Sequence, residues 1–147
     1  MKTGTDDGGE GGLTRNAVLR YNCCIDAAMS VIEGRWKCTI LCMLCTNGPM
    51  RFSELERRIG EVTSRILSKQ LRELEGDCMV RRTVESDGKL KVTYSLTDKG
   101  RSIIPILGAL AQWGARNQAV QVIVPTDPSA LGHLDGDPAR AGAVELA

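Results

Sequence analysis

Apolar residues recur at helical spacing in four consecutive segments of the central part of the chain. The segments are residues 26–33, 36–45, 53–59 and 64–77. Gly34, Gly48 and Gly60 follow the first three, and glycine commonly ends a helix. Ser53, with Glu56 at the capping-box position, is the expected N-cap of the third helix, and Thr63 is the expected N-cap of the fourth. The pattern predicts four helices in succession.

The fourth of these helices is amphipathic. Leu67, Leu71 and Leu74 recur at i, i+4 and i+7 and form the inward stripe. The opposite face presents Arg65, Ser68, Lys69 and Arg72. Such a face is either a plain solvated surface or a DNA-reading surface, because arginine can bind guanine bidentately when a helix lies in the major groove.

A hairpin is expected directly after this helix. Residues 80–85 and 91–96 have the β-branched content of strands, and Ser86-Asp87-Gly88-Lys89 supplies the turn. Basic side chains at Arg81, Arg82, Lys89 and Lys91 suit contacts with the sugar-phosphate backbone or the minor groove. The order of elements predicts an α+β, mainly helical fold, a winged helix-turn-helix with flanking dimerisation helices.

A last helix is expected from Thr97-Asp98-Lys99-Gly100 onwards, with Pro105 as a bend or a break. Its apolar positions are Ile103, Ile104, Leu107, Leu110 and Trp113. We expect this helix and residues 13–22 to form a two-fold interface, because a homodimer can place two recognition helices about one DNA turn apart. The alternative is a helix that folds back on its own core.

Charge is distributed unevenly along the 147 residues, although the formal net charge is only +1. Residues 1–12 and 125–147 hold 2 of the 19 basic and 7 of the 18 acidic side chains, so residues 13–124 carry an excess of 6 positive charges. This excess favours a polyanionic partner such as double-stranded DNA. We expect residues 1–12 to be a disordered N-terminal tail, 13–124 a single domain and 125–147 a flexible C-terminal tail.

The chain also resembles a known family, the HxlR-type, MarR-like transcriptional regulators. The segments that carry the resemblance are Cys23 followed after twelve residues by Trp36 within Gly34-Arg35-Trp36-Lys37, then Arg51-Phe52-Ser53-Glu54-Leu55, Leu71-Arg72-Glu73-Leu74-Glu75 and Tyr94-Ser95-Leu96-Thr97-Asp98-Lys99-Gly100-Arg101. The match covers roughly residues 21–114. The resemblance implies a homodimeric bacterial winged-helix regulator that often senses electrophiles or oxidants through a cysteine near its first helix, and Cys23 falls on that position.

Three features depart from the family pattern. Cys24 stands where the family usually has proline, Cys78 where it usually has glycine, and Asp87-Gly88-Lys89-Leu90 replaces a proline-containing wing tip. The first two bear on what is sensed, and the third bears on the wing contacts. The expected DNA-binding residues are Arg51, Thr63, Ser64, Arg65, Ser68, Lys69, Arg72, Lys89 and Lys91.

The six cysteines fall into two groups by their expected surroundings. Cys38, Cys42 and Cys45 share one face of the apolar second helix, where cysteine serves as a small hydrophobe. The alternative is a zinc or iron–sulfur site that combines the CxxC spacing with Cys23 or Cys24.

Cys23 and Cys24 are expected in a loop ahead of the first helix. There, Arg20 and a helix N-terminus would lower a thiol pKa and favour the reactive thiolate. We predict that both are redox-sensing residues, and that oxidation or alkylation of Cys23 alters the half-site spacing of the dimer and its operator affinity. A disulfide partner would be Cys78, a thiol of the second helix, or a thiol of the other subunit.

An enzyme is the competing class of function. The only histidine, His133, lies in the expected C-terminal tail, and no glycine pattern of a phosphate-binding loop follows a strand. We therefore expect a cytoplasmic regulator without catalytic residues, cofactor, metal or membrane segment. The alternatives are a metal- or iron–sulfur-sensing regulator, a small-ligand-responsive regulator, a cysteine-based reductase, and an interaction module that does not bind DNA.

Overall fold

The computed structural model describes residues 20–118. The chain divides into two units, residues 1–30 and residues 31–147, and each is described by itself. Helix α1 (Cys24–Ile32) begins in the first unit and ends in the second. The described residues do not include the expected tails at 1–12 and 125–147, residues 13–19 of the expected dimer surface, or His133.

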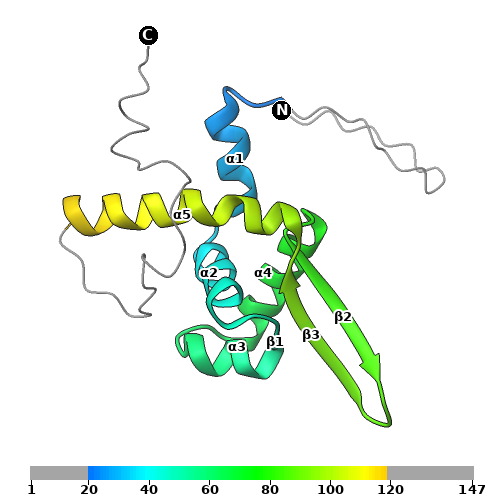
Figure 1. Cartoon of the computed structure of the whole chain (residues 1–147). Coiled ribbons are helices and arrows are strands. Elements are labelled where there is room, and N and C mark those ends of the chain that lie inside the picture. Colours follow the sequence, from blue (N-terminus) through cyan, green and yellow to red (C-terminus); the bar gives the residue numbers. More distant parts are fainter. Residues whose placement is uncertain (1–19, 119–147) are drawn as a thin grey trace. The chain divides into compact units, whose positions relative to one another are not determined.

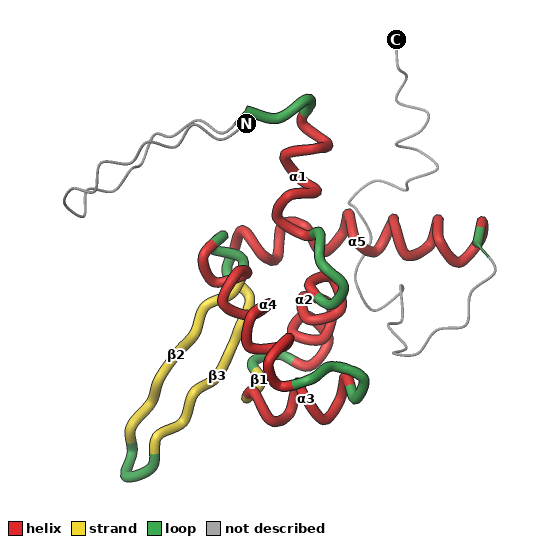
Figure 2. The backbone as a smooth tube through the Cα atoms, turned by 180° about the vertical axis from the view of Figure 1, so that it is seen from behind, coloured by secondary structure: helices red, strands yellow, loops and turns green. Residues whose placement is uncertain are grey.

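The second unit contains four helices and a small antiparallel sheet among its described residues (Figure 1). The elements are α2 (Lys37–Asn47), β1 (Met50–Arg51), α3 (Phe52–Ile59), α4 (Ser64–Gly76), β2 (Val80–Ser86), β3 (Leu90–Leu96) and α5 (Asp98–Asn117). In Figure 2 the β2–β3 hairpin extends away from the helices as a long wing. The predicted winged helix-turn-helix fold is confirmed, and α5 runs through Pro105 as one helix.

Strand β1 is an element that the sequence pattern did not predict. It has two residues and pairs with β3, with Met50 opposite Tyr94 and Arg51 opposite Thr93, so the strand order is β1-β3-β2. Two residues are too few to show an alternating pattern, and only the partner strand defines them. Pairing keeps Arg51 extended, with φ −83° and ψ 159°, and α3 starts at the next residue.

This early start corrects the predicted cap of α3. Arg51, and not Ser53, is the N-cap, and its backbone N–H donates to the carboxylate of Glu54 at 3.2 Å. Ser53 lies inside the first turn of the helix. The predicted cap of α4 is confirmed, because the Thr63 hydroxyl accepts a hydrogen bond from the backbone N–H of Ile66 at 3.2 Å.

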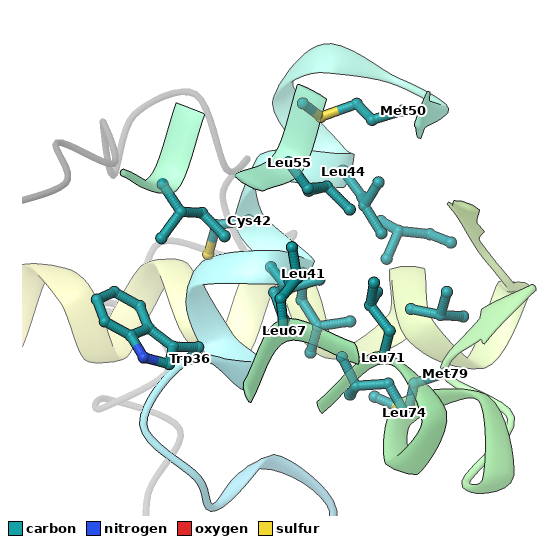
Figure 3. Packing of buried hydrophobic residues seen from close by; sticks show 14 of the residues in the cluster. Trp36, Leu41, Cys42, Leu44, Met50, Leu55, Leu67, Leu71, Leu74 and Met79 are labelled. Atoms are coloured by element: carbon teal, nitrogen blue, oxygen red, sulfur yellow. The ribbon is translucent and has the colours of Figure 1, made fainter. Parts of the chain in front are cut away.

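The core lies where α2, α3, α4 and α5 meet the base of the sheet (Figure 3). Leu67, Leu71 and Leu74 are at most 1% exposed, which confirms the inward stripe of α4. Buried partners from the other elements include Leu41, Leu44, Leu55, Met79, Val80, Leu96 and Ile104. Packing of this stripe fixes the rotation of α4 about its axis and directs the opposite face outward.

Candidate nucleic-acid interface

The outward face of α4 is the centre of the candidate site. Arg65, Lys69 and Arg72 are exposed and lie opposite the buried leucine stripe. All three belong to the first nine residues of the helix, whereas its acidic residues, Glu73 and Glu75, follow towards the C-terminal end. The N-terminal part of α4 therefore combines positive side chains with the positive end of the helix dipole, which suits a polyanion.

The three hydroxyl residues expected at the site have bonding partners within the protein. Thr63 caps α4, and the Ser64 hydroxyl donates to a carboxylate oxygen of Glu56 on α3. The Ser68 hydroxyl accepts a hydrogen bond from the guanidinium of Arg72 at 3.5 Å. Of these contacts, the one between Ser64 and Glu56 joins the start of α4 to α3.

An ion pair between a buried lysine and a half-buried glutamate ties α4 to α2. Lys37 is 4% exposed, and its Nζ lies 3.1 Å from Oε1 of Glu73. Gln70, one turn before Glu73, approaches the loop ahead of α2, since a Cβ added to Gly34 would lie 2.7 Å from Oε1 of Gln70. The inner flank of α4 is thus positioned by the Lys37–Glu73 ion pair as well as by leucines.

The wing carries its basic side chains on both faces. Lys91 lies opposite Glu85 and Arg82 opposite Tyr94 in the β2–β3 register. Side chains alternate between faces, so Arg81 and Lys91 share one face while Arg82 lies on the other. Lys89 is exposed in the turn, and Glu85 offsets part of the charge of Lys91.

Arg51 joins this surface only through the fold. Its partner Thr93 lies opposite Thr83, so Arg51 shares a sheet face with Arg81 and Lys91. Sequence reasoning omitted Arg57 and Arg58, which are exposed in the last turn of α3. Two adjacent arginines in the sequence were the signal that could have identified them as part of the basic surface. The Arg58 guanidinium donates to Oδ1 of Asn47 at 3.0 Å.

The cysteines of α2 lie in the core or against it, as predicted. Cys42 is buried, and burial raises the pKa of its thiol to about 12, with smaller contributions from Cys38 and Cys45. Burial also raises the pKa of Cys38, whose Sγ lies 3.7 Å from the carbonyl oxygen of Ile32. Residues 20–118 contain no group of three or more metal-ligating side chains that could hold an ion.

Cys23 precedes α1, as predicted, whereas Cys24 is the first residue of the helix and not part of the loop before it. The helix begins at Cys24, two residues earlier than predicted, and the carbonyl oxygen of Cys23 accepts a hydrogen bond from the backbone N–H of Ala27 at 3.1 Å. Both thiols are exposed, as is that of Cys78. Exposure, one requirement of a reactive cysteine, is met by these three residues and not by Cys42.

Helix α5 divides its apolar residues between two faces. Ile104 and Leu107 are buried, whereas Leu110 and Trp113 are 51% and 59% exposed. Ile106, absent from the predicted set, is 48% exposed and joins them at i, i+4 and i+7. None of the helices between residues 20 and 118 combines the length and apolar character needed to cross a lipid bilayer.

A recognition helix with a basic face, a capped N-terminus and an adjoining β-wing define a winged helix-turn-helix protein. Residues 31–122 match the HxlR-like helix-turn-helix family, and the chain belongs to that family. It is a transcriptional regulator of the helix-turn-helix type. A regulator of this type from Methanothermobacter thermautotrophicus is 46% identical over 94 residues, covering 64% of this chain and 71% of the relative.

Two solved structures support the same assignment. The redox regulator HypR in its oxidised form is 41% identical with a TM-score of 0.60, covering 67% of this chain and all of that one. The reduced transcriptional regulator YodB from Bacillus subtilis is 26% identical with a TM-score of 0.58, and the match covers 67% of this chain and 95% of that one. These comparisons connect the chain with regulators that have been studied in defined redox states.

Proposed function

We propose that the chain is a homodimeric, sequence-specific DNA-binding regulator whose operator affinity responds to oxidants or electrophiles through Cys23. The outward basic face of α4 is the observation that carries DNA binding. Arg65, Lys69 and Arg72 enter the major groove in this proposal, and Lys89 and Lys91 on the wing contact the backbone. Thr63 and Ser64 present the first turn of α4 to a phosphate, and Arg51 supports the wing.

Fluorescence anisotropy on the DNA upstream of the protein's own gene tests this role at two salt concentrations. Arg65→Gln with Lys69→Gln should weaken binding at least about tenfold and flatten the salt dependence, because charge-neutralising contacts are lost. Arg116→Gln, a charge removal at the far end of α5, is the control and should leave binding nearly unchanged. Equal effects of the two changes would contradict the assigned surface.

The exposed stripe of Ile106, Leu110 and Trp113 supports the dimer. A two-fold partner would cover these side chains and remove their apolar surface from water. Size-exclusion chromatography with light scattering should find a dimer at micromolar concentration. Leu110→Glu should shift it towards monomer, whereas Gln112→Glu, on another part of the same helix, should not. A monomeric native chain would overturn the dimer.

Redox control is supported by the exposed thiols at α1 and by the likeness to two regulators: HypR, solved in oxidised and reduced forms, and YodB, solved in a reduced and a diamide-treated form. Cys23 and a second exposed thiol would form a disulfide, while diamide takes up their two electrons and two protons and becomes the hydrazine. Cys24 is the neighbouring thiol that tunes this reaction, and Cys78, or a cysteine of the other subunit, is the partner.

Diamide should lower operator affinity, and dithiothreitol should restore it. Cys23→Ser should abolish the response, whereas Cys42→Ser should retain it, since a thiol with a pKa of about 12 holds almost no thiolate at neutral pH. A non-reducing gel then distinguishes a bond between subunits from one within the chain. A Cys23→Ser protein that still releases DNA on oxidation would contradict the assigned sensor.

A further inference from the structure

A cavity of about 320 Å³ lies within the second unit, where the C-terminal end of α2, the end of β3 and the first half of α5 meet. Its apolar wall includes Leu44, Leu96 and Ile104. The polar lining consists of Cys45, Ser95 and Arg101. None of the DNA-binding residues proposed above lines it.

The lining has the composition of a small-molecule site. A volume of this size is at the lower end of the range for ligand pockets, about 300–1,000 Å³, and such pockets pair apolar walls with a few polar groups. Arg101 is the only charged residue in the lining. A guanidinium at the edge of an apolar cavity can bind a carboxylate through two parallel hydrogen bonds.

Asp98, the ion-pair partner of Arg101, leaves the guanidinium available to such a ligand. Its Nη1 lies 3.7 Å from Oδ1 of Asp98, and both side chains are strongly exposed. Exposed pairs of this kind contribute little to stability and exchange readily with water or other ions. We propose that the cavity binds a small organic acid, with its carboxylate on Arg101 and its apolar body against the lining that includes Leu44 and Ile104.

The cavity lies next to the hydrogen bonds that attach the end of β3 to the segment between α4 and β2, which are elements of the proposed DNA-binding surface. Leu96, in the cavity lining, is followed by Thr97. The Thr97 hydroxyl donates to the carbonyl oxygen of Cys78 at 2.5 Å, and the Thr97 backbone N–H donates to the carbonyl oxygen of Met79 at 3.2 Å. An acid wedged between β3 and α5 therefore shifts the wing and the end of α4. This regulatory effect rests on the proposed DNA-binding function, whereas the ligand site itself rests on the cavity.

Isothermal titration calorimetry on the reduced full chain, with naphthoate as the probe, tests the site directly. Naphthoate should bind, naphthalenemethanol should bind much more weakly, and Arg101→Gln should weaken naphthoate roughly tenfold through loss of a charged hydrogen bond. Cys45→Phe should fill the cavity and abolish binding, and circular dichroism verifies that this variant folds. Arg116→Gln, on the same helix outside the cavity, should bind naphthoate like the native chain.

Each outcome decides one part of the proposal. No binding, equal binding of the neutral alcohol, or binding unaffected by Arg101→Gln would overturn the acid site. If naphthoate binds as expected, anisotropy on DNA should show an operator affinity shifted about fivefold or more. Binding of naphthoate without such a shift would overturn the regulatory coupling alone, and a chain that binds naphthoate but no DNA would overturn the proposed function alone.

Discussion

A Cβ added to Gly100, in the first turn of α5, would lie 2.1 Å from the backbone carbonyl oxygen of Met79. No side chain fits at that separation. The same carbonyl accepts the backbone N–H of Thr97 at 3.2 Å, and the Thr97 hydroxyl accepts the N–H of Gly100 at 3.0 Å while capping α5. The start of α5 is thereby held directly against the junction of α4 and β2.

Gly100→Ala should destabilise the protein by roughly 1–3 kcal/mol, because the backbone of α5 must move away from Met79. Urea denaturation monitored by circular dichroism measures the loss. Gly114→Ala is the matched control in the same helix, with no atom within 4 Å of the added Cβ apart from its chain neighbours and the adjacent helix backbone, and should be neutral or stabilising by up to about 1 kcal/mol. A stability for Gly100→Ala equal to that of the control would show that the contact is not tight.

Cys78→Gly should stabilise the protein by about 1 kcal/mol, because Cys78 has φ 60°, a conformation that costs a residue with a Cβ. Met79 N–H donates to the carbonyl of Leu74 at 2.9 Å and Cys78 N–H to that of Glu75 at 3.0 Å, which is the Schellman pattern that favours glycine. Cys78→Ala, which retains the Cβ, should change little. A melting temperature raised equally by both changes would attribute the effect to the thiol.

The Lys37–Glu73 pair should respond asymmetrically to substitution. Glu73→Ala leaves an ammonium that is 5% exposed without a partner, whereas Lys37→Met leaves a carboxylate side chain that is 41% exposed and can turn towards water. We expect Glu73→Ala to cost about 2 kcal/mol and Lys37→Met clearly less. Chemical denaturation of both variants checks the order, and a larger loss for Lys37→Met would contradict it.

Alkaline pH should weaken the fold through Cys42. Its folded pKa, about 12, exceeds the ordinary value of 9.0, so the folded state holds the proton longer than the unfolded state does. This contribution is fully present below pH 9 and is lost as pH rises from about 9 to about 12. Cys42→Ala should reduce the slope of stability against pH in that window, and an unchanged slope would exclude Cys42 as its source.

Thiol labelling should separate the cysteines by exposure. Cys23, Cys24 and Cys78 are exposed, whereas Cys38 and Cys45 are partly buried and Cys42 is buried. Iodoacetamide at neutral pH should modify the first three rapidly and Cys42 only after denaturation, as mass spectrometry of timed samples would show. Fast labelling of Cys42 in the native protein would contradict its place in the core.

The sequence by itself determined which segments form helices and a hairpin, because the leucine period of α4, the Thr63 cap and the glycine stops are local signals. Local signals gave the wrong N-cap for α3, because the start of that helix depends on pairing with a strand that is distant in the sequence. Pairing of β1 with β3 moved the cap of α3 from Ser53 to Arg51, and it placed Arg51 on the same sheet face as Arg81 and Lys91.

Only the tertiary structure decided which chemically similar residues differ in environment. Cys42 became a buried thiol and Cys78 an exposed one in a left-handed conformation. Ile104 entered the core while Ile106, two residues later, remained exposed. The buried Lys37 acquired an ion-pair partner 36 residues away, and Arg101 came to line a cavity between three elements. Periodicity records which side of an element is apolar, whereas burial and charge pairing depend on what the rest of the chain packs against it.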